Sequence, residues 1–459
     1  MSKPGLPQGT RDFGPETVYK RNFIFETIRS VFECYGFEPL ETPAMENLDT
    51  LLGKYGEEGD QLIFKILNNG LDHVSKKETA RVAFENILNG KNDKGITERA
   101  LRYDLTIPFA RYVAMHQHEI PFPYRRYQLQ PVWRADRPQK GRYREFYQCD
   151  ADVVGSRSLM NEVELAQIYL DVFKKLGIDV ELRINHRKIL AGLAENCGGA
   201  DKSTLITTAI DKLDKIGIGK VKEELREKNL TDAQVELVEK YLHIKGNHAE
   251  KIHQLAELLP NEWTQAGIAD LHDILKFFTL EDPLVLDFSL ARGLNYYTGI
   301  IFEVRARGVQ IGSIGGGGRY DDLTGLFGVP GIPGVGISFG VDRIYDVMEE
   351  LKCFPPAVHR STRVLFFNLG EEAADKSFEL MQELRRDGIR CELYPEPVKF
   401  DKQFKYAEKK NIPRVLIIGP DELLSGKAKI KNLVSGVQEE VRFEELRDLL
   451  KAERSTANA

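Results

Sequence analysis

The chain has 459 residues, of which 42% are hydrophobic and 29% charged, and its formal net charge is −6. This length exceeds that of one ordinary core, so we expect about three domains. No apolar run approaches the roughly 20 residues that cross a bilayer, and no apolar stretch follows the charged N-terminus. These features argue against a membrane protein and against a secreted one, so we expect a protein of the cytoplasm. Five distant cysteines without a Cys-x-x-Cys pair argue against a disulfide framework or a structural zinc site.

The first predicted elements are a helix over 16–35, with apolar residues at three-and-four spacing, and an extended edge segment over 37–43, where prolines exclude a helix. Aromatic and β-branched residues then predict two antiparallel strands over 124–133 and 143–154. The charged loop 135–142 joins them, and its basic residues suit either phosphate contact or a solvated turn.

The middle of the chain predicts an interrupted sheet. A helix over 160–176 and a strand over 178–184 precede a helix-rich, lysine-rich stretch that has the character of an insertion. Strand character returns at 300–305 and 335–340, and a helix follows over 341–351. Completion of a sheet after such an interruption indicates an antiparallel α+β domain.

The last part of the chain predicts a separate domain. A proline-containing segment at 353–361 has the composition of a semi-rigid linker. Strands and helices then alternate from 363 to 418, which indicates a small α/β domain with a largely parallel sheet.

A ligand site is indicated by the run Arg292-Gly293-Leu294-Asn295-Tyr296-Tyr297-Thr298-Gly299, which is followed by a glycine-rich segment over 312–320. A guanidinium beside two phenols and several glycines suits an anion in an aromatic-lined pocket, although a β-hairpin with a glycine-rich turn is the competing interpretation. Arg134 ends a predicted strand, and Arg343 follows another glycine-rich strand. Three arginines in such settings together suggest an anionic ligand.

Over nearly its whole length the sequence resembles the histidyl-tRNA synthetase family, which belongs to the class II aminoacyl-tRNA synthetases. The segment around Pro43 is similar to class II motif 1, 133–146 to motif 2 and 334–343 to motif 3, while 292–299 and 312–320 resemble the two signatures peculiar to the histidine enzymes. The resemblance implies an α+β catalytic domain with an antiparallel sheet over 1–185 and 286–352, a helical insertion over 186–285, a linker over 353–361 and a C-terminal α/β anticodon-binding domain over 362–459.

The implied activity is the ATP-dependent conversion of L-histidine to histidyl-adenylate and transfer of the histidyl group to the 3′ end of tRNA(His). The resemblance of the segment around Pro43 to motif 1 also implies a homodimer, which we expect in the cytoplasm. The chemistry of a triphosphate substrate implies Mg²⁺ carried on the phosphate oxygens, without a dedicated set of protein ligands. The alternatives are a non-catalytic regulatory or RNA-binding paralogue and a ligase for another amino acid. Retention of Arg134, Arg292, Arg343 and the C-terminal domain argues against the first. Tyr296, Tyr297 and Asp152 argue against the second.

The same resemblance implies the roles of individual residues. The catalytic residues would be Arg292, Arg134 and Arg343, which bind phosphate and stabilise its developing charge. Histidine would contact Asp104, Thr106, Arg134, Gln148, Asp152, Arg292, Tyr296 and Tyr297, and ATP would contact Arg134, Arg142, Phe146 and Arg343. Asp104, Thr106 and Gln148 would bind the α-amino group, Asp152 and Tyr297 the imidazole, and Phe146 the adenine. A helix cap or strand end is the competing interpretation of Asp104. Asp136 and Asn295 depart from the usual glutamate and aspartate, which leaves local details open.

Overall fold

The computed structural model describes residues 3–279, 281–291, 296–358 and 362–457 of the chain. These residues form two compact units, Met1–Phe354 and Pro355–Ala459. Arg292 and Asn295, singled out from the sequence, lie outside the described residues. Among the helices that are described, none combines the length and the apolar character that crossing a membrane requires.

In the described residues, the first unit is built on an eight-stranded sheet with the strand order β1-β5-β6-β11-β10-β9-β7-β8. The strands are β1 (Glu38–Pro39), β5 (Tyr124–Trp133), β6 (Glu145–Val154), β7 (Val180–His186), β8 (Leu284–Leu286), β9 (Ile300–Ala306), β10 (Gly315–Tyr320) and β11 (Gly334–Gly340). The inner pairings are antiparallel, whereas the edge strands β1 and β8 run parallel to their neighbours. The predicted antiparallel sheet of an α+β domain is therefore confirmed, with parallel strands added at both edges.

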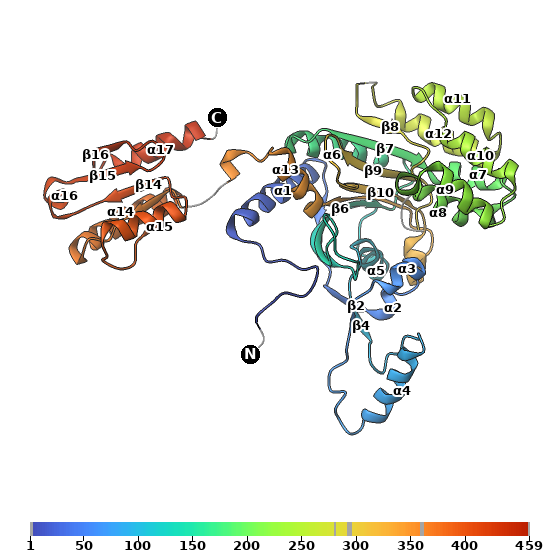
Figure 1. Ribbon diagram of the computed structural model, residues 1–459, viewed down its shortest axis with the longest axis horizontal. Helices are drawn as coiled ribbons and strands as arrows, with labels where there is room; N and C mark the ends of the chain where they lie inside the picture. The colour runs from blue at the N-terminus through green and yellow to red at the C-terminus, as the bar shows by residue number, and fades with distance from the viewer. Residues whose placement is uncertain (1–2, 280, 292–295, 359–361, 458–459) are drawn as a thin grey trace. The chain divides into compact units, whose positions relative to one another are not determined.

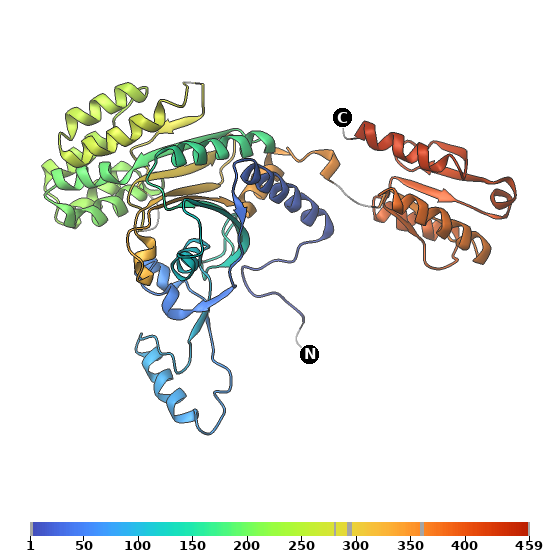
Figure 2. The ribbon, with the colours of Figure 1, turned by 180° about the vertical axis from the view of Figure 1, so that it is seen from behind.

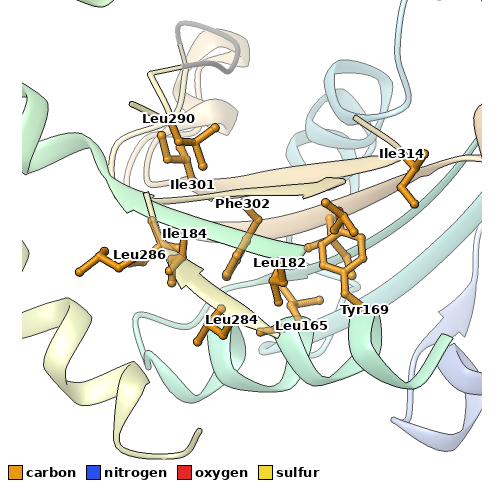
Figure 3. Packing of buried hydrophobic residues seen from close by; sticks show 14 of the residues in the cluster. Leu165, Tyr169, Leu182, Ile184, Leu284, Leu286, Leu290, Ile301, Phe302 and Ile314 are labelled. Carbon is orange, nitrogen blue, oxygen red and sulfur yellow. The ribbon is translucent and has the colours of Figure 1, made fainter. Parts of the chain in front are cut away.

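Alternation along β6 gives the sheet one apolar and one polar face. Cys149, Ala151 and Val153 are buried in the main core, and Gln148 and Asp150 face the opposite side because successive side chains of a strand alternate. The core side is covered by α1 (Pro15–Cys34), α6 (Met160–Leu176) and α13 (Val341–Leu351), which contact one another or the central strands (Figure 1). Figure 3 shows how side chains of α6 pack beside those of β7 and β8 in this core.

Six helices lie between β7 and β8 in the sequence: α7 (Arg187–Asn196), α8 (Ser203–Asp211), α9 (Leu213–Glu227), α10 (Asp232–Leu242), α11 (His248–Leu258) and α12 (Glu262–Leu275). Helices α7 and α12 pack closely, since a Cβ on Gly267 would lie only 2.8 Å from Cγ1 of Ile189. Buried side chains of these helices belong to the same apolar cluster as the sheet. The helical segment is thus continuous with the main core at the β7 end of the sheet (Figure 2).

A smaller layer, which the sequence did not predict, lies on the polar side of the main sheet. It contains the sheet β2 (Met45–Asn47), β4 (Arg99–Leu101), β3 (Lys65–Ile66) and the helices α2 (Leu48–Leu51), α3 (Gly56–Gln61), α4 (Lys77–Leu88) and α5 (Thr106–His116). Leu48, Ile107 and Phe109 pack there against Tyr320 of β10. Helix α4 projects from this layer in both views (Figures 1 and 2).

The second unit has a mixed sheet with the order β13-β12-β14-β15-β16. Its elements are β12 (Val364–Phe366), α14 (Glu371–Arg386), β13 (Cys391–Leu393), α15 (Phe400–Lys409), β14 (Arg414–Ile417), α16 (Pro420–Ser425), β15 (Lys427–Asn432), β16 (Gln438–Arg442) and α17 (Leu446–Ala457). The parallel core β13-β12-β14 agrees with the predicted alternation. The expectation of a largely parallel sheet is wrong, because β15 and β16 extend it in antiparallel fashion.

Candidate active site

A cavity of about 280 Å³ lies on the polar side of the main sheet. Its wall brings together nine of the predicted site residues: Asp104, Thr106, Arg134, Arg142, Phe146, Gln148, Tyr296, Tyr297 and Arg343. They come from the start of α5, from β6 and the loop before it, from the segment before β9 and from the start of α13. Arg292 lies outside the described residues, and Asp152 does not line the cavity.

The cavity exists because small residues stand beside the polar ones across the sheet. In the strand register, Asp150 of β6 pairs with Ser338 of β11, which pairs with Gly316 of β10. The neighbouring row runs from Asp152 to Gly336. A Cβ on Gly336 would lie 2.0 Å from Oδ1 of Asp152, so only glycine leaves room for that carboxylate. Side chains on β10 and β11 would otherwise fill the space.

Gly318 likewise leaves room for a neighbouring side chain, that of Tyr297. An added Cβ at this position of β10 would approach Cδ1 of Tyr297 to 2.9 Å. The Tyr297 ring lies 4.9 Å from that of Tyr296, in an edge-to-face arrangement. Burial raises the pKa of both phenols, and nearby carboxylates raise the pKa of Tyr297 further. Both side chains are therefore neutral hydrogen-bonding groups at physiological pH.

Asp104 was expected either to bind the substrate or to cap a helix, and its contacts are compatible with both roles. Its Oδ1 accepts hydrogen bonds from the Tyr55 hydroxyl at 2.9 Å and from the Ile107 backbone N–H at 3.1 Å, which caps the start of α5. Its Oδ2 is buried and has no hydrogen-bond partner among the described residues. Burial raises the pKa of Asp104, while the backbone bond and the positive charge of Arg134 lower it. One oxygen thus fixes the residue, which lines the cavity, and the other oxygen is left without a described partner.

Arg134 is held flat between aromatic groups. Its guanidinium carbon lies 4.3 Å from the ring centre of Tyr103 and 5.2 Å from that of Phe146, and its Nε donates to the Tyr103 carbonyl at 3.0 Å. Stacking and the backbone hydrogen bond restrict the rotation of the planar fork. Arg134 is therefore positioned before any anion binds.

Arg343 is also oriented by backbone carbonyls. Its Nε donates to the Gly141 oxygen at 2.7 Å and its Nη1 to the Ser313 oxygen at 2.6 Å. The preceding residue, Asp342, forms an ion pair with Arg21 at 2.6 Å and accepts from the Tyr147 backbone N–H at 3.0 Å. These contacts join the start of α13 to β6 and to the glycine segment before β10, so the sheet fixes the place of the guanidinium.

The polar residues of β6 divide into a cavity wall and a layer behind it. Gln148 lines the cavity, and its Nε2 donates to the Ser338 hydroxyl at 2.9 Å. Asp152 is 2% exposed; its Oδ1 accepts from the Tyr320 hydroxyl at 2.5 Å, and its Oδ2 lies 2.8 Å from Nη2 of Arg126. Asp150, which was not among the predicted site residues, lines the cavity instead.

Other contributors to the site were also absent from the prediction. Tyr55 holds Asp104, Ser338 bonds to Gln148, and Arg126 pairs with Asp152. The alternation of polar residues from Gln148 to Asp152 was a usable signal for Asp150, since all three share one face of a strand. Tyr55 and Arg126 had no such signal, because their contacts depend on the arrangement of distant elements.

Comparison with known proteins gives a consistent result. Residues 92–344 match the family model of histidyl-tRNA synthetase, and residues 363–453 match that of an anticodon binding domain. The chain is 52% identical to a histidine–tRNA ligase of Porphyromonas gingivalis, covering 96% of this chain and 97% of the relative. It is 53% identical to one from Bacteroides fragilis, covering 97% and 98%.

Solved structures agree with these matches. The crystal structure of histidyl-tRNA synthetase from Nostoc sp. PCC 7120 superposes with a TM-score of 0.81 at 31% identity, covering 99% of this chain and all of that one. A Bacillus halodurans structure described as an ATP phosphoribosyltransferase regulatory subunit/histidyl-tRNA synthetase has a TM-score of 0.72 at 20% identity, covering 91% and 98%. The second likeness concerns the fold alone.

Proposed function

The chain belongs to the histidyl-tRNA synthetase family, and on that premise we propose how its residues carry out the reaction. The activity is that of a histidine–tRNA ligase: histidine is activated with ATP and transferred to tRNA(His), for which the second unit supplies an anticodon-binding domain. One observation carries the assignment of the site. A single cavity places buried carboxylates at Asp104 and Asp150 together with the guanidinium groups of Arg134 and Arg343. An amino acid and a nucleotide need these opposite charges.

In the first step, a histidine carboxylate oxygen attacks the α-phosphorus of ATP, the bond to the β-phosphate oxygen breaks, and pyrophosphate leaves. Arg134 would bind the α-phosphate and the histidine carboxylate together, because its planar fork offers two parallel donors to such oxygens. In the second step, a hydroxyl of the tRNA 3′-terminal ribose attacks the carbonyl carbon of the adenylate. The new ester forms and AMP leaves.

The nucleotide would lie along the arginine side of the cavity. We assign Arg343 and Arg142 to the triphosphate and Phe146 to the adenine ring, and all three line the cavity. Arg292 would face the α-phosphate from the other side and stabilise its developing charge, an assignment that rests on the sequence resemblance. Preorganised donors of this kind are worth on the order of 10² to 10³ in rate.

Mg²⁺ would arrive on the triphosphate, whose oxygens and bound waters supply most of the ligands that this ion prefers. The carboxylate of Asp136 lines the same cavity, with Oδ1 3.5 Å from Nη1 of Arg142, and would offer one further oxygen. When bound, the ion would neutralise charge on the leaving pyrophosphate.

Histidine would lie against the carboxylate side of the cavity. Oδ2 of Asp104, with Thr106 and Gln148, would bind the α-ammonium group. Tyr296 packs beside Tyr297, and the Tyr297 hydroxyl would meet one imidazole nitrogen. The carboxylate of Asp152 would accept a hydrogen bond from the other nitrogen, an assignment that rests on the sequence resemblance. Substrates without ring nitrogens would leave buried polar groups unpaired, which disfavours them strongly.

We also propose a cytoplasmic class II homodimer with the motif 1 segment around Pro43 at its interface. The domain limits that we propose are 1–185 with 286–352 for catalysis, 186–285 for the helical insertion, 353–361 for the linker and 362–459 for anticodon binding. Sedimentation at assay concentration measures the association, and an active monomer would contradict the proposed dimer.

Pyrophosphate exchange with each amino acid in turn tests the activity. Histidine should give by far the strongest exchange of labelled pyrophosphate into ATP, and a stronger signal with another amino acid would make the specificity wrong. A regulatory paralogue would give no exchange with any amino acid. Arg292→Ala should slow adenylate formation more than it weakens histidine binding, because its partner charge develops during the reaction.

A further inference from the structure

The N-terminal segment over residues 7–13 precedes α1 and lies against the loop 134–144, which joins β5 to β6 and carries Arg142 of the candidate active site. The Gly9 carbonyl accepts a hydrogen bond from the Arg144 backbone N–H at 2.9 Å, and the Arg144 carbonyl accepts one from the Arg134 backbone N–H at 3.0 Å. Arg134 lines the cavity. Two backbone hydrogen bonds thus connect the N-terminal segment to the cavity wall.

Gly9 allows this close approach. Its φ is +84°, and an added Cβ would lie 2.8 Å from Cγ of Arg144 and 2.9 Å from Cγ of Pro138, both of which belong to the loop. A residue with a side chain would therefore strain the backbone and push the segment away from the loop. A Cβ on Gly5, by contrast, would meet no described atom within 4 Å.

Arg11 links the loop to the start of α13. Its guanidinium carbon lies 3.3 Å from the ring centre of Tyr143, and its Nη2 pairs with Oδ1 of Asp342. Tyr143 and Asp342 both line the cavity, and Asp342 directly precedes Arg343. The Tyr143 hydroxyl donates to Asp346 of α13 at 3.0 Å, which holds the same ring against the helix. The Arg11 side chain therefore bridges the two elements that carry the arginines assigned to the triphosphate.

Asp342 has a second cationic partner. Nη1 of Arg21 on α1 lies 2.6 Å from the same Oδ1. The guanidinium carbons of Arg11 and Arg21 lie 4.9 Å and 4.2 Å from the ring centre of Phe13, so this ring fixes both of them. The side chain of Arg21 is 6% exposed, whereas that of Arg11 is 26% exposed. Because Arg21 would still pair with the buried carboxylate, loss of Arg11 should displace the loop more than it destabilises the fold.

We propose that Arg11 is a positioning residue for ATP, which holds the loop 134–144 against the start of α13 so that Arg142 and Arg343 face the triphosphate together. Arg11 is not among the described residues that line the cavity, so it acts through Tyr143 and Asp342 and not on the ligand itself. Its contacts lie on the nucleotide side of the cavity, and the affinity for histidine should not depend on them. This inference rests on the proposed function and adds to it a residue that sets the affinity for ATP.

The test uses two variants with matched controls. Arg11→Ala is compared with Lys20→Ala, because Nζ of Lys20 also pairs with α13, at 2.7 Å from Glu349, which is not among the described residues of the cavity wall. Gly9→Ala is compared with Gly5→Ala. Pyrophosphate exchange gives KM for ATP at saturating histidine and KM for histidine at saturating ATP. Calorimetric titration with ATP gives the dissociation constant without catalysis, and the melting temperature of each variant establishes folding.

For Arg11→Ala we expect KM and the dissociation constant for ATP to rise about 10-fold and KM for histidine to change less than about twofold, since small displacements of binding groups cost this much. Gly9→Ala should shift the constants for ATP in the same direction, and both controls should match the wild type. The inference is overturned if Arg11→Ala leaves the affinity for ATP unchanged, if it raises both KM values equally, or if Lys20→Ala weakens ATP binding as much. Absence of histidine-dependent exchange in the wild type would refute the proposed function instead, and the ATP titration would still decide the role of Arg11.

Discussion

Replacement of Arg134 by lysine tests whether the site needs only a positive charge or also the planar guanidinium that carries it. The variant keeps one positive charge at the end of β5, but it loses the planar fork, the stacking on Tyr103 at 4.3 Å and on Phe146 at 5.2 Å, and the Nε bond to the Tyr103 carbonyl at 3.0 Å. A lysine ammonium is a point charge on a flexible stem and cannot bind two oxygens in parallel.

The structure allows the effects on stability and on catalysis to be compared. The lost stacking is worth about 0.5–1 kcal/mol at a partly exposed site, and the lost hydrogen bond about 0.5–1.5 kcal/mol. Loss of a preorganised donor to developing charge costs about 2.7–4 kcal/mol, or roughly 10² to 10³ in kcat. Catalysis should therefore suffer more than folding.

The assay is histidine-dependent pyrophosphate exchange at saturating ATP, combined with thermal unfolding. Arg226→Lys is the control, because Arg226 is an exposed arginine whose Nε lies 2.9 Å from Asp232 in the helical segment. We expect the control to retain wild-type exchange. A fall in kcat of less than about fivefold for Arg134→Lys, with wild-type unfolding, would refute a phosphate role for the Arg134 fork.

Three further predictions concern the site and its scaffold. Gly336→Ala should raise KM for histidine and lower the melting temperature, since its Cβ would lie 2.0 Å from the Asp152 carboxylate. The control Gly219→Ala in α9, whose Cβ would meet no described atom within 4 Å, should leave the melting temperature unchanged or raise it. Equal effects of the two substitutions would contradict the crowding argument. Tyr297→Phe should raise KM for histidine about 5- to 10-fold by loss of one hydrogen bond, with unchanged unfolding; an unchanged KM would exclude the phenol from ring binding. For the unliganded protein, Asp150→Asn should gain stability relative to wild type as pH rises from about 4 to about 7. The reason is that burial raises the pKa of Asp150 from 3.8 to about 7 in the folded state, so the wild type loses stability over this range while the asparagine variant does not. A difference in thermal unfolding that does not change with pH would contradict this.

Elements with strong periodicity and clear ends could be predicted from the sequence. The expected limits of β5, α6 and α13 agree with the observed ones, because apolar residues recur regularly along them. The extended segment 37–43 forms only the two-residue strand β1, since prolines limit its pairing to the edge. Strand β15, with the sequence KAKIKN, was missed although its polar and apolar residues alternate, which is the pattern of a half-buried strand.

The candidate site was predictable where the chemistry lies in short motifs. Nine of the proposed residues line one cavity. They could be named from the sequence because each belongs to a segment whose order of residues is itself distinctive. The separation of Asp150 from Asp152 could not be predicted in that way. Both share one face of β6, and only the register with Arg126 on β5 and the position of the Tyr320 hydroxyl determine which carboxylate is engaged.

The wall of the cavity contains buried oxygens that lower the stability of the unliganded protein and can be paired by a substrate. Oδ2 of Asp104, Oε1 of Gln148 and Oδ1 of Asp150 are all buried without a hydrogen-bond partner among the described residues, and each such group costs about 1–3 kcal/mol. All three residues line the cavity. A substrate whose N–H donors reach all three oxygens recovers this free energy, whereas an amino acid of similar size without a donor in its side chain recovers only part of it. Discrimination therefore follows from the wall itself, through the number of its buried oxygens that a given substrate can satisfy.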